Sequence, residues 1–522
     1  MMSNQKIKSL GQYFTPPEIV NFMVGLIEKD KNTSIFEPCA GKGAFLKGLS
    51  ENGFTNFTAY EIDKDLENQS DVKIDYKDTL LEKPKQKFDV IIGNPPYVRW
   101  KNIEQDKRNE LKNNYYWKER INGLNDLLYL FIFSAIDSLK ENGELIFITP
   151  TFWTSTMHSK ALRKKLLEEG ELTHFIDFNE LKIFNGVASN ILIFRFVKSK
   201  RNRQIKVIKV MNKGKISSTV IGELNQILSG LDDKNYITFN GYEAYLYKQF
   251  EGVEPWNPLP VNIEKVTNAI ERNADAKLGY LANICNGMVS GLDEAFKVSG
   301  DIKFSEKEKT NLIKVVKAKN LDKYFPIGYT NYIFLNDKVK TEKELDKLVN
   351  IKSKIINFKE RLNARYAYGG GIPWWHWIFL RNRQAIENSK IKIVVPSKER
   401  YDINNHVRFA LIEGKYYISQ DVSAIIKKPE IKEDIRYLLA VLNSDLIFLW
   451  LRYKGLKRGG VLEFSEKPLS IIPIKRINWE NKDEVETYKK IIKITNNVLE
   501  RKDYTGDKEK LERLIEALYG IS

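Results

Sequence analysis

Residues 88–97, FDVIIGNPPY, decide the fold because an apolar run ends there in a rigid turn. The Val-Ile-Ile core of this stretch has the β-branched character of a buried strand. Pro95 and Pro96 lack an N–H and restrict the residue before them, so the strand can neither continue its ladder nor turn at once into a helix. Parallel α/β sheets place their binding residues at such strand ends. The pattern indicates that Asn94 and Tyr97 face a ligand, although a stiff loop with Tyr97 packed on the surface would give the same sequence.

Apolar strand-like runs alternate with amphipathic helical patterns through the first two hundred residues. The strand candidates are residues 33–38, 57–63, 88–94, 143–150, 173–178 and 189–197. Helical patterns, such as those over 16–29 and 126–140, separate them. This alternation predicts an α/β fold in which a parallel-rich sheet carries helices on both faces.

The length of 522 residues predicts two or three domains. After residue 200 the pattern changes to charged, irregular and aromatic-rich segments, and three prolines crowd into residues 251–260. A stretch of this kind is typical of a linker. We therefore predict a first domain over 1–250, a linker over 251–261, a second domain over 262–475 and a helical tail over 476–522.

The net charge of +16 indicates a polyanionic partner, and its distribution is uneven. Residues 1–200 hold 28 Lys and Arg against 27 Asp and Glu, whereas the rest of the chain holds 56 against 41. This asymmetry favours a near-neutral catalytic part and a basic part that meets phosphates. A generally lysine-rich surface is the alternative.

Cysteine usage and hydropathy favour a cytoplasmic protein without a membrane segment. The chain has two cysteines, Cys39 and Cys285, and no apolar segment typical of a secretion signal near its first residue. Its longest apolar run, near residue 130, is about ten residues long, whereas a membrane span needs about 18. His158 and His174 lack the spacing of metal ligands, so we expect no metal site.

A second motif follows the first predicted strand, in FEPCAGKGAFL over residues 36–46. Gly41 and Gly43 permit a tight turn and a close approach of the backbone to a ligand. Eighteen residues past Gly43, the next strand ends at Glu61, where an acid can accept both hydroxyls of a ribose. Glu37 would repel a pyrophosphate but suits a cofactor with positive charge. S-adenosylmethionine, which carries a sulfonium and an ammonium group, fits this combination better than NAD.

Taken in order, the motifs GQYFTPPEIVNFMV, FEPCAGKGAFL, AYEID, KDTL and GNPPYV resemble those of the γ-class adenine-N6 DNA methyltransferases. Residues 277–298, 437–450 and 459–474 resemble the C-terminal specificity domain of the TaqI-type enzymes in that class. The resemblance covers nearly all of residues 11–475. It implies a Rossmann-like S-adenosylmethionine-dependent methyltransferase sheet followed by a mixed α+β domain that recognises double-stranded DNA. It also implies a modification enzyme of a restriction system, for which a separate cognate restriction endonuclease is an expected partner.

The resemblance also implies roles for individual residues. The implied catalytic residues are Asn94, Pro95, Pro96, Tyr97 and Phe184. The implied cofactor-binding residues are Thr15, Glu37, Pro38, Cys39, Gly41, Gly43, Glu61 and Asp78. Thr15 is also compatible with a helix N-cap, Phe184 with a core position, and either Ile62 or Phe54 with packing on the cofactor's adenine.

The implied chemistry explains the Asn-Pro-Pro turn. An adenine amine is a poor nucleophile because its lone pair is delocalised, and two fixed acceptors, the Asn94 side-chain oxygen and the Pro95 carbonyl, would localise that pair. The base would have to leave the duplex and stack between Tyr97 and Phe184. Two alternatives remain: a methyltransferase acting on RNA or protein, and a DNA-binding modification subunit active only in a complex.

Overall fold

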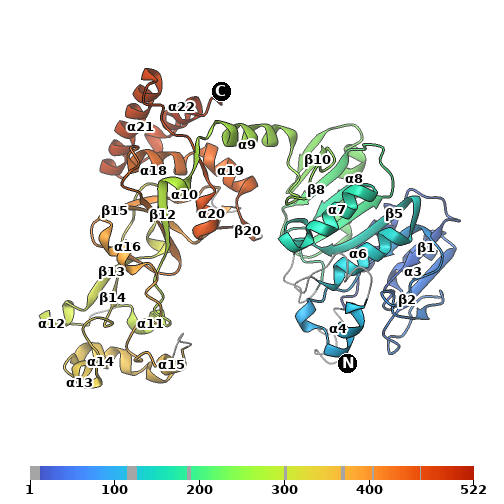
Figure 1. Cartoon of the computed structure of the whole chain (residues 1–522), viewed down its shortest axis with the longest axis horizontal. Coiled ribbons are helices and arrows are strands. Elements are labelled where there is room, and N and C mark those ends of the chain that lie inside the picture. Colours follow the sequence, from blue (N-terminus) through green and yellow to red (C-terminus); the bar gives the residue numbers. More distant parts are fainter. Residues whose placement is uncertain are drawn as a thin grey trace. The chain divides into compact units, whose positions relative to one another are not determined.

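The computed structural model describes residues 12–113, 126–184, 190–298, 302–365, 371–401, 405–458 and 460–521. The chain divides into two compact units, which are Met1–Val261 (unit 1) and Asn262–Ser522 (unit 2) (Figure 1). Each unit has hydrophobic clusters of its own.

Unit 1 is built on one sheet with the strand order β3-β2-β1-β4-β5-β7-β6-β8-β10-β9. The strands are β1 (Ser34–Glu37), β2 (Asn56–Glu61), β3 (Asp75–Tyr76), β4 (Phe88–Gly93), β5 (Leu139–Pro150), β6 (Glu171–Asp177), β7 (Ile191–Val197), β8 (Ile205–Val210), β9 (Tyr236–Phe239) and β10 (Tyr242–Tyr247). Strands β1 to β5 pair in parallel, and β7 lies antiparallel between β5 and β6. The carboxyl ends of β1, β2 and β4 therefore meet at one edge of the sheet.

Helices cover both faces of this sheet (Figure 1). One face packs on α2 (Pro17–Gly25), α3 (Ala44–Glu51) and α8 (Ser218–Gly230), and the other on α4 (Gln105–Lys112), α6 (Leu127–Ser138) and α7 (Lys160–Glu169). Alternate side chains point to opposite faces, so Ile92 joins the cluster of α2 and Ile91 joins that of α6. Short 3-10 turns follow β4 and β5 at η1 (Trp100–Asn102), η2 (Thr151–Thr154) and η3 (Met157–Ser159).

The predicted α/β architecture is confirmed, and each of the six predicted strands is present with shifted ends. The sheet also continues beyond residue 200 through β8, β9 and β10, where the sequence suggested irregular structure. These three strands contain charged residues and tyrosines, so they lack the clear apolar pattern on which strand prediction depends. These added pairs include antiparallel ones, so the sheet is mixed.

The segment predicted as a linker, residues 251–261, is part of unit 1. Trp256 is buried, its ring stacks on Phe250 with centroids 4.5 Å apart, and its backbone N–H donates to the Thr154 carbonyl. The boundary between the two compact units falls after Val261, at the end of this segment. No helix in the described part of the chain is long and apolar enough to cross a membrane.

Unit 2 is a mixed α+β body with several small sheets, in the orders β12-β19-β15-β17, β14-β13-β18, β16-β21-β20 and β11-β22. Its strands are β11 (Ala276–Lys277), β12 (Ala282–Asn286), β13 (Leu312–Val316), β14 (Thr330–Ile333), β15 (Ile391–Pro396), β16 (Lys398–Arg400), β17 (Ala410–Glu413), β18 (Tyr417–Ile418), β19 (Val422–Lys427), β20 (Lys457–Arg458), β21 (Val461–Glu463) and β22 (Pro473–Ile474). Its helices are α9 (Val261–Asn273), α10 (Leu278–Leu281), α11 (Asp293–Phe296), α12 (Glu306–Lys309), α13 (Glu342–Asp346), α14 (Val349–Ile356), α15 (Lys359–Asn363), α16 (Arg383–Asn388), α18 (Ile435–Asn443), α19 (Asp445–Lys454), α20 (Glu466–Ser470), α21 (Lys482–Arg501) and α22 (Lys508–Leu518), with 3-10 turns η4 (Ala318–Asn320) and η5 (Thr505–Asp507).

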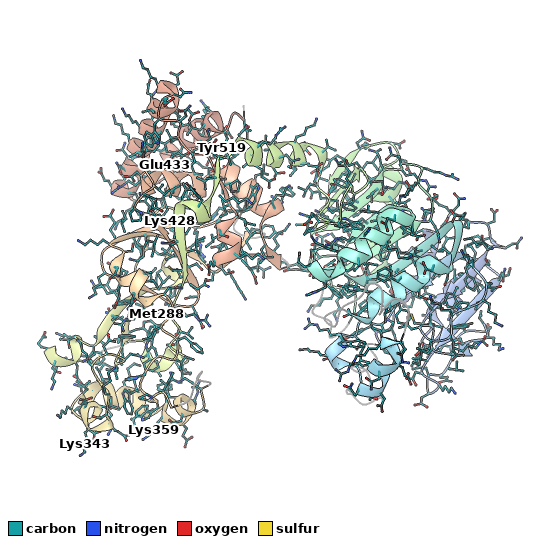
Figure 2. The ribbon with its side chains drawn as sticks, in the orientation of Figure 1. Met288, Lys343, Lys359, Lys428, Glu433 and Tyr519 are labelled. Carbon is teal, nitrogen blue, oxygen red and sulfur yellow. The ribbon has the colours of Figure 1, made fainter. Side chains whose placement is uncertain are left out.

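Two hydrophobic clusters organise unit 2. The predicted helical tail forms α21 and α22, which pack with α18 and α19 around Tyr519. Figure 2 labels Tyr519 and Glu433 at this helical end, and Lys343 and Lys359 at the opposite end of the same unit. The second cluster buries Trp374, Trp375 and Trp377.

Candidate functional site

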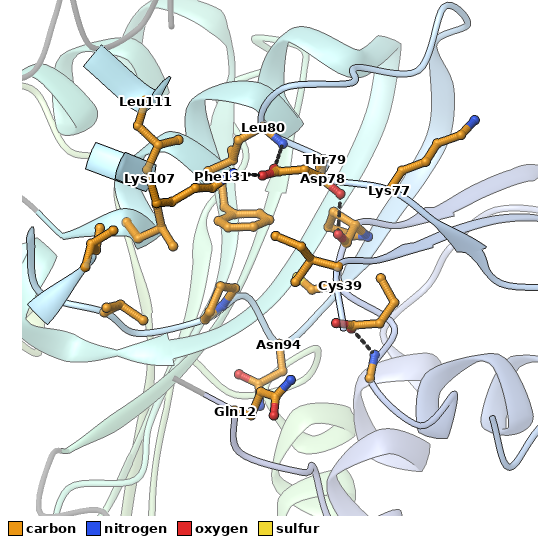
Figure 3. A pocket seen from close by; sticks show the side chains of 18 of the residues that line it. Gln12, Cys39, Lys77, Asp78, Thr79, Leu80, Asn94, Lys107, Leu111 and Phe131 are labelled. Carbon is orange, nitrogen blue, oxygen red and sulfur yellow. Dashed lines mark hydrogen bonds and ion pairs between the residues drawn. The ribbon is translucent and has the colours of Figure 1, made fainter. Parts of the chain in front are cut away.

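Three loops meet where β1, β2 and β4 end, and they surround a cavity of about 330 Å³ in unit 1 (Figure 3). A cavity of this size is at the lower end of the range for small-molecule sites. The predicted site residues that line it are Pro38, Cys39, Gly41, Glu61, Asp78, Asn94 and Pro96. Gln12, Tyr13, Phe14 and Ile62 add to its wall, together with Lys107 from α4.

The loop after β1 needs glycine at two positions. Gly41 and Gly43 have φ angles of +56° and +82°, which are unfavourable for residues with a Cβ. A Cβ at Gly43 would also lie 2.7 Å from the side-chain oxygens of Asn68 and Ser70. Gly43 is the N-cap of α3, so the loop leads directly into that helix.

Glu61 ties this loop to the end of β2. Its Oε2 accepts from the Gly41 N–H at 2.7 Å, and its Oε1 accepts from the Asp63 N–H at 2.8 Å. Burial raises the pKa of Glu61, and backbone hydrogen bonds from Asp63, Gly41 and Ile62 oppose that rise. A carboxylate oxygen has more than one lone pair, so each can still accept from a ligand hydroxyl.

Glu37, at the end of β1, is a buried acid without a partner for one of its oxygens. It is 1% exposed, and its Oε2 has no hydrogen-bond partner among the described residues. Burial, with a smaller contribution from Glu61, raises the pKa of Glu37 well above its ordinary value. Leaving such an acceptor unpaired is costly. A ligand that brings a positively charged donor would satisfy it.

Asp78, which follows β3, is already engaged on both oxygens. Its Oδ1 accepts from the Leu80 N–H at 2.9 Å, and its Oδ2 forms an ion pair with Lys107 (Figure 3). The neighbouring Thr79 hydroxyl donates to the carbonyl of Pro38, which joins this loop to the one after β1. Lys107 lies on α4, a helix of mostly charged and polar residues, and no sequence motif includes it.

The structure distinguishes the two candidates for packing on a cofactor ring. Ile62 is 49% exposed and lines the cavity. Phe54 is 2% exposed and belongs to the hydrophobic cluster beneath α2 and α3. Ile62 is therefore the one available to a ligand. Cys39 also faces the cavity, and burial raises the pKa of its thiol well above the ordinary value.

Asn94 is held by hydrogen bonds in a defined orientation. Its Nδ2 donates to the Tyr13 carbonyl at 2.8 Å and to the Thr15 hydroxyl at 3.2 Å. Its Oδ1 accepts from the Tyr97 hydroxyl, which also lies 3.0 Å from the Ile148 carbonyl. Because the amide nitrogen of Asn94 donates to two acceptors, the orientation of the side chain and the position of its oxygen are fixed. Pro95, directly after it, is buried.

Thr15 does not cap a helix. Helix α2 begins at Pro17, its N-cap is Pro16, and that end has no side-chain cap hydrogen bond. The Thr15 hydroxyl is buried and accepts from Asn94 instead. The capping interpretation is therefore wrong, because the side chain that could have capped α2 is recruited to orient Asn94.

Three aromatic rings gather beside Asn94. Tyr13 is stacked on Tyr97 with centroids 5.9 Å apart and an interplanar angle of 20°. The Tyr13 and Phe184 rings have centroids 6.0 Å apart and an interplanar angle of 43°. Phe184 is 5% exposed and joins the hydrophobic cluster of that face. Tyr13 lies within a quoted motif, two residues before Thr15, but sequence reasoning did not single it out.

The charge asymmetry follows the division into units. Unit 1 holds 36 Lys and Arg against 33 Asp and Glu, whereas unit 2 holds 48 against 35. Two stretches of unit 2, residues 366–383 and 452–460, combine aromatic residues, glycines and arginines, a composition that suits contacts with DNA grooves. Residues 366–370 and 459 lie outside the described residues, and Arg383 is paired with Asp337 and Glu387.

Comparison with known proteins identifies the family. The chain is 39% identical over 520 residues to the type II methyltransferase M.HindII of Haemophilus influenzae, covering 97% of this chain and 96% of that protein. M.HincII, also from Haemophilus influenzae, is 39% identical over 504 residues, with the same coverage of both chains. The chain belongs to the type II DNA methyltransferases.

Family models agree with this assignment. Residues 33–184 of this methyltransferase match the Eco57I restriction-modification methylase family, and residues 1–55 match the N-6 DNA Methylase family. Among solved structures, the type IIL restriction-modification enzyme MmeI in complex with DNA aligns with a TM-score of 0.58 at 13% identity. That alignment covers 100% of this chain and 78% of MmeI, and it supports the fold alone.

Proposed function

We propose that this methyltransferase transfers a methyl group to the exocyclic N6 of an adenine that has been turned out of duplex DNA. The fixed carboxamide oxygen of Asn94 carries the proposal. This oxygen can accept one hydrogen of the adenine amine, and the Pro95 carbonyl can accept the other. The two hydrogen bonds together draw the amine nitrogen toward a tetrahedral geometry. The Asn94 oxygen does not have to reorganise, because the amide nitrogen of the same side chain donates to Tyr13 and Thr15.

The residues that line the cavity, together with Glu37 directly before Pro38, fit S-adenosylmethionine. When bound, this cofactor supplies an electrophilic methyl group on a sulfonium. The unpaired oxygen of Glu37 would accept from its ammonium group, Glu61 would bind the ribose hydroxyls, and Asp78 with Ile62 would hold the adenine. The remaining residues of the proposed cofactor set are Thr15, which accepts from Asn94, and Pro38, Cys39, Gly41 and Gly43 in the loop after β1.

An extrahelical base would stack on Tyr97, with Phe184 as the opposite wall. Turning a base out of the duplex costs a few kcal/mol, and stacking on an aromatic side chain returns about 1–3 kcal/mol per base. Pro96 keeps Tyr97 at a fixed distance from Asn94 because its ring restricts the backbone. The two aromatic walls therefore contribute to both binding and orientation of the base.

Unit 2 is the part we expect to recognise DNA, as a specificity domain of the TaqI type. Its excess of 48 Lys and Arg over 35 Asp and Glu supports this role, because phosphate contacts dominate DNA affinity. A separate cognate restriction endonuclease is the partner expected for such an enzyme.

The test uses the purified full-length chain and S-adenosylmethionine with a deuterated methyl group. The enzyme is incubated in parallel with bacterial genomic DNA, total RNA and soluble protein, and the hydrolysed products are analysed by mass spectrometry. We expect deuterated N6-methyldeoxyadenosine from DNA alone. Label found as N4-methyldeoxycytidine, or only in RNA or protein, would contradict the proposal.

A further inference from the structure

The aromatic site beside Asn94 contains a ring that belongs to the protein itself. Tyr13 lies within stacking distance of both proposed walls, at 5.9 Å from Tyr97 and 6.0 Å from Phe184. Its angle of 20° to Tyr97 is close to parallel, as a stacked base would be. Tyr13 therefore makes the contacts that the proposed function assigns to the target adenine.

The three rings are held to different degrees. The Tyr97 hydroxyl is fixed by Asn94 and Ile148, and the Phe184 side chain is buried in a hydrophobic cluster. Within the described residues the Tyr13 hydroxyl has no hydrogen-bond partner, and its side chain is half-buried. The hydrogen bond that anchors Tyr13 runs from Asn94 to its backbone carbonyl, whereas its ring is held by packing alone. The ring can therefore turn without breaking the contact that orients Asn94.

We propose that Tyr13 occupies the place of the target base in the free enzyme and is displaced when the base enters. This inference rests on the proposed function, because it takes Tyr97 and Phe184 as the walls of the base site. Tyr13 would keep the aromatic surfaces covered until DNA binds. It would also oppose the entry of a base that arrives without the contacts of a recognition sequence.

The energies of the two stacks permit this exchange. The contact between two aromatic side chains of a protein favours the stacked state about 2- to 13-fold, in addition to the effect of burying their apolar area. Stacking of a base on an aromatic side chain contributes about 5- to 160-fold. A base can thus replace Tyr13, yet Tyr13 lowers the apparent affinity for that base.

The test measures binding of 2-aminopurine deoxynucleoside by fluorescence quenching, which needs no knowledge of the recognition sequence. The full-length enzyme is first saturated with S-adenosylhomocysteine, so that the nucleoside cannot occupy the cofactor cavity. We expect Tyr13→Ala to bind the nucleoside about 2- to 13-fold more tightly than the wild type, because the competing ring is gone. Tyr13→Phe, which keeps the ring, should bind as the wild type does.

Affinity that is unchanged or weaker in Tyr13→Ala would overturn the inference, since a permanent wall of the pocket loses affinity when removed. Tyr13→Leu, which retains an apolar side chain against the core, replaces the alanine variant if that variant unfolds. It too should bind the nucleoside more tightly than the wild type. Wild-type methylation of DNA is measured in the same preparations. If the wild type methylates adenine while the Tyr13 variants show no gain, the inference fails and the proposed function stands.

Discussion

Unit 1 is close to neutral, with 36 basic and 33 acidic residues, whereas unit 2 carries 48 and 35. In unit 1 the groups that matter are buried and individually placed: Glu37 is 1% exposed and Glu61 5%. In unit 2 the excess charge is spread over many side chains. The difference suggests that catalysis here depends on a few preorganised groups, each with a large effect when removed, and that DNA affinity depends on the sum of many small ones.

The largest effect that we expect is the loss of DNA affinity with rising salt concentration, which should be a property of unit 2. If six to ten phosphates are neutralised, DNA affinity should fall by about 10³–10⁵ between 50 and 200 mM salt. The isolated unit Asn262–Ser522, which has its own core, should show nearly the slope of the full chain, and Met1–Val261 a shallow one. A fluorescence-anisotropy titration of all three on one duplex measures this. A steep slope in the unit 1 fragment would break the comparison.

Asn94→Ala should lower the single-turnover methylation rate by about 10²–10³, the usual loss for one preorganised hydrogen-bonding group. Cofactor and DNA affinities should change little, because Asn94 faces the substrate amine. Asn225→Ala, an exposed asparagine on α8, is the matched control and should keep the wild-type rate. Wild-type turnover in the Asn94 variant would remove Asn94 from the mechanism.

Glu61→Ala should weaken S-adenosylmethionine binding by about 1.5–3 kcal/mol, the range for hydrogen bonds to a charged group. The loss includes release of the Gly41 N–H, which shapes the cofactor loop. Isothermal titration calorimetry gives the dissociation constants, and the exposed Glu67→Ala serves as control. Equal affinities of the Glu61 variant and the wild type, with the fold intact, would make Glu61 a structural residue only.

The smallest effect expected is a pH dependence caused by Glu37. Because burial raises the pKa of Glu37, the free carboxyl binds a proton more readily than an exposed one, and a cationic ligand must displace that proton. Affinity for S-adenosylmethionine should therefore rise with pH, by up to about tenfold per pH unit below that pKa. Glu37→Gln should bind more weakly and lose the slope. If Glu37→Gln keeps the wild-type dependence of affinity on pH, the proton that the cofactor displaces belongs to another group.

The sequence allowed six strands of unit 1 to be predicted, because buried strands followed by rigid or glycine-rich turns have a local physical signature. Asn94 and Glu61 became candidate site residues in this way. Lys107 was missed because it reaches Asp78 from a helix whose own sequence is simply charged. Tyr13 was missed because the role we propose for it rests on two ring contacts with residues far along the chain, which no local pattern encodes.

Unit 2 was far less predictable at the level of its elements. Its four-stranded sheet pairs β12 near residue 284 with β19 near residue 425, and no short-range pattern specifies such a register. Several of its strands have only two to four residues, too few for periodicity to be detected. Its excess of basic residues, by contrast, can be counted directly from the sequence.

The central claim, that Asn94 belongs to a site that methylates adenine in DNA, is tested most directly by mapping methylated bases in living cells. DNA from bacteria expressing the wild-type chain is compared, by long-read sequencing, with DNA from cells expressing Asn94→Ala. We predict that the wild type modifies adenine within one short sequence at nearly all of its occurrences, and that the variant modifies none. Modified cytosines, or adenine methylation that persists in the Asn94→Ala cells, would contradict the account.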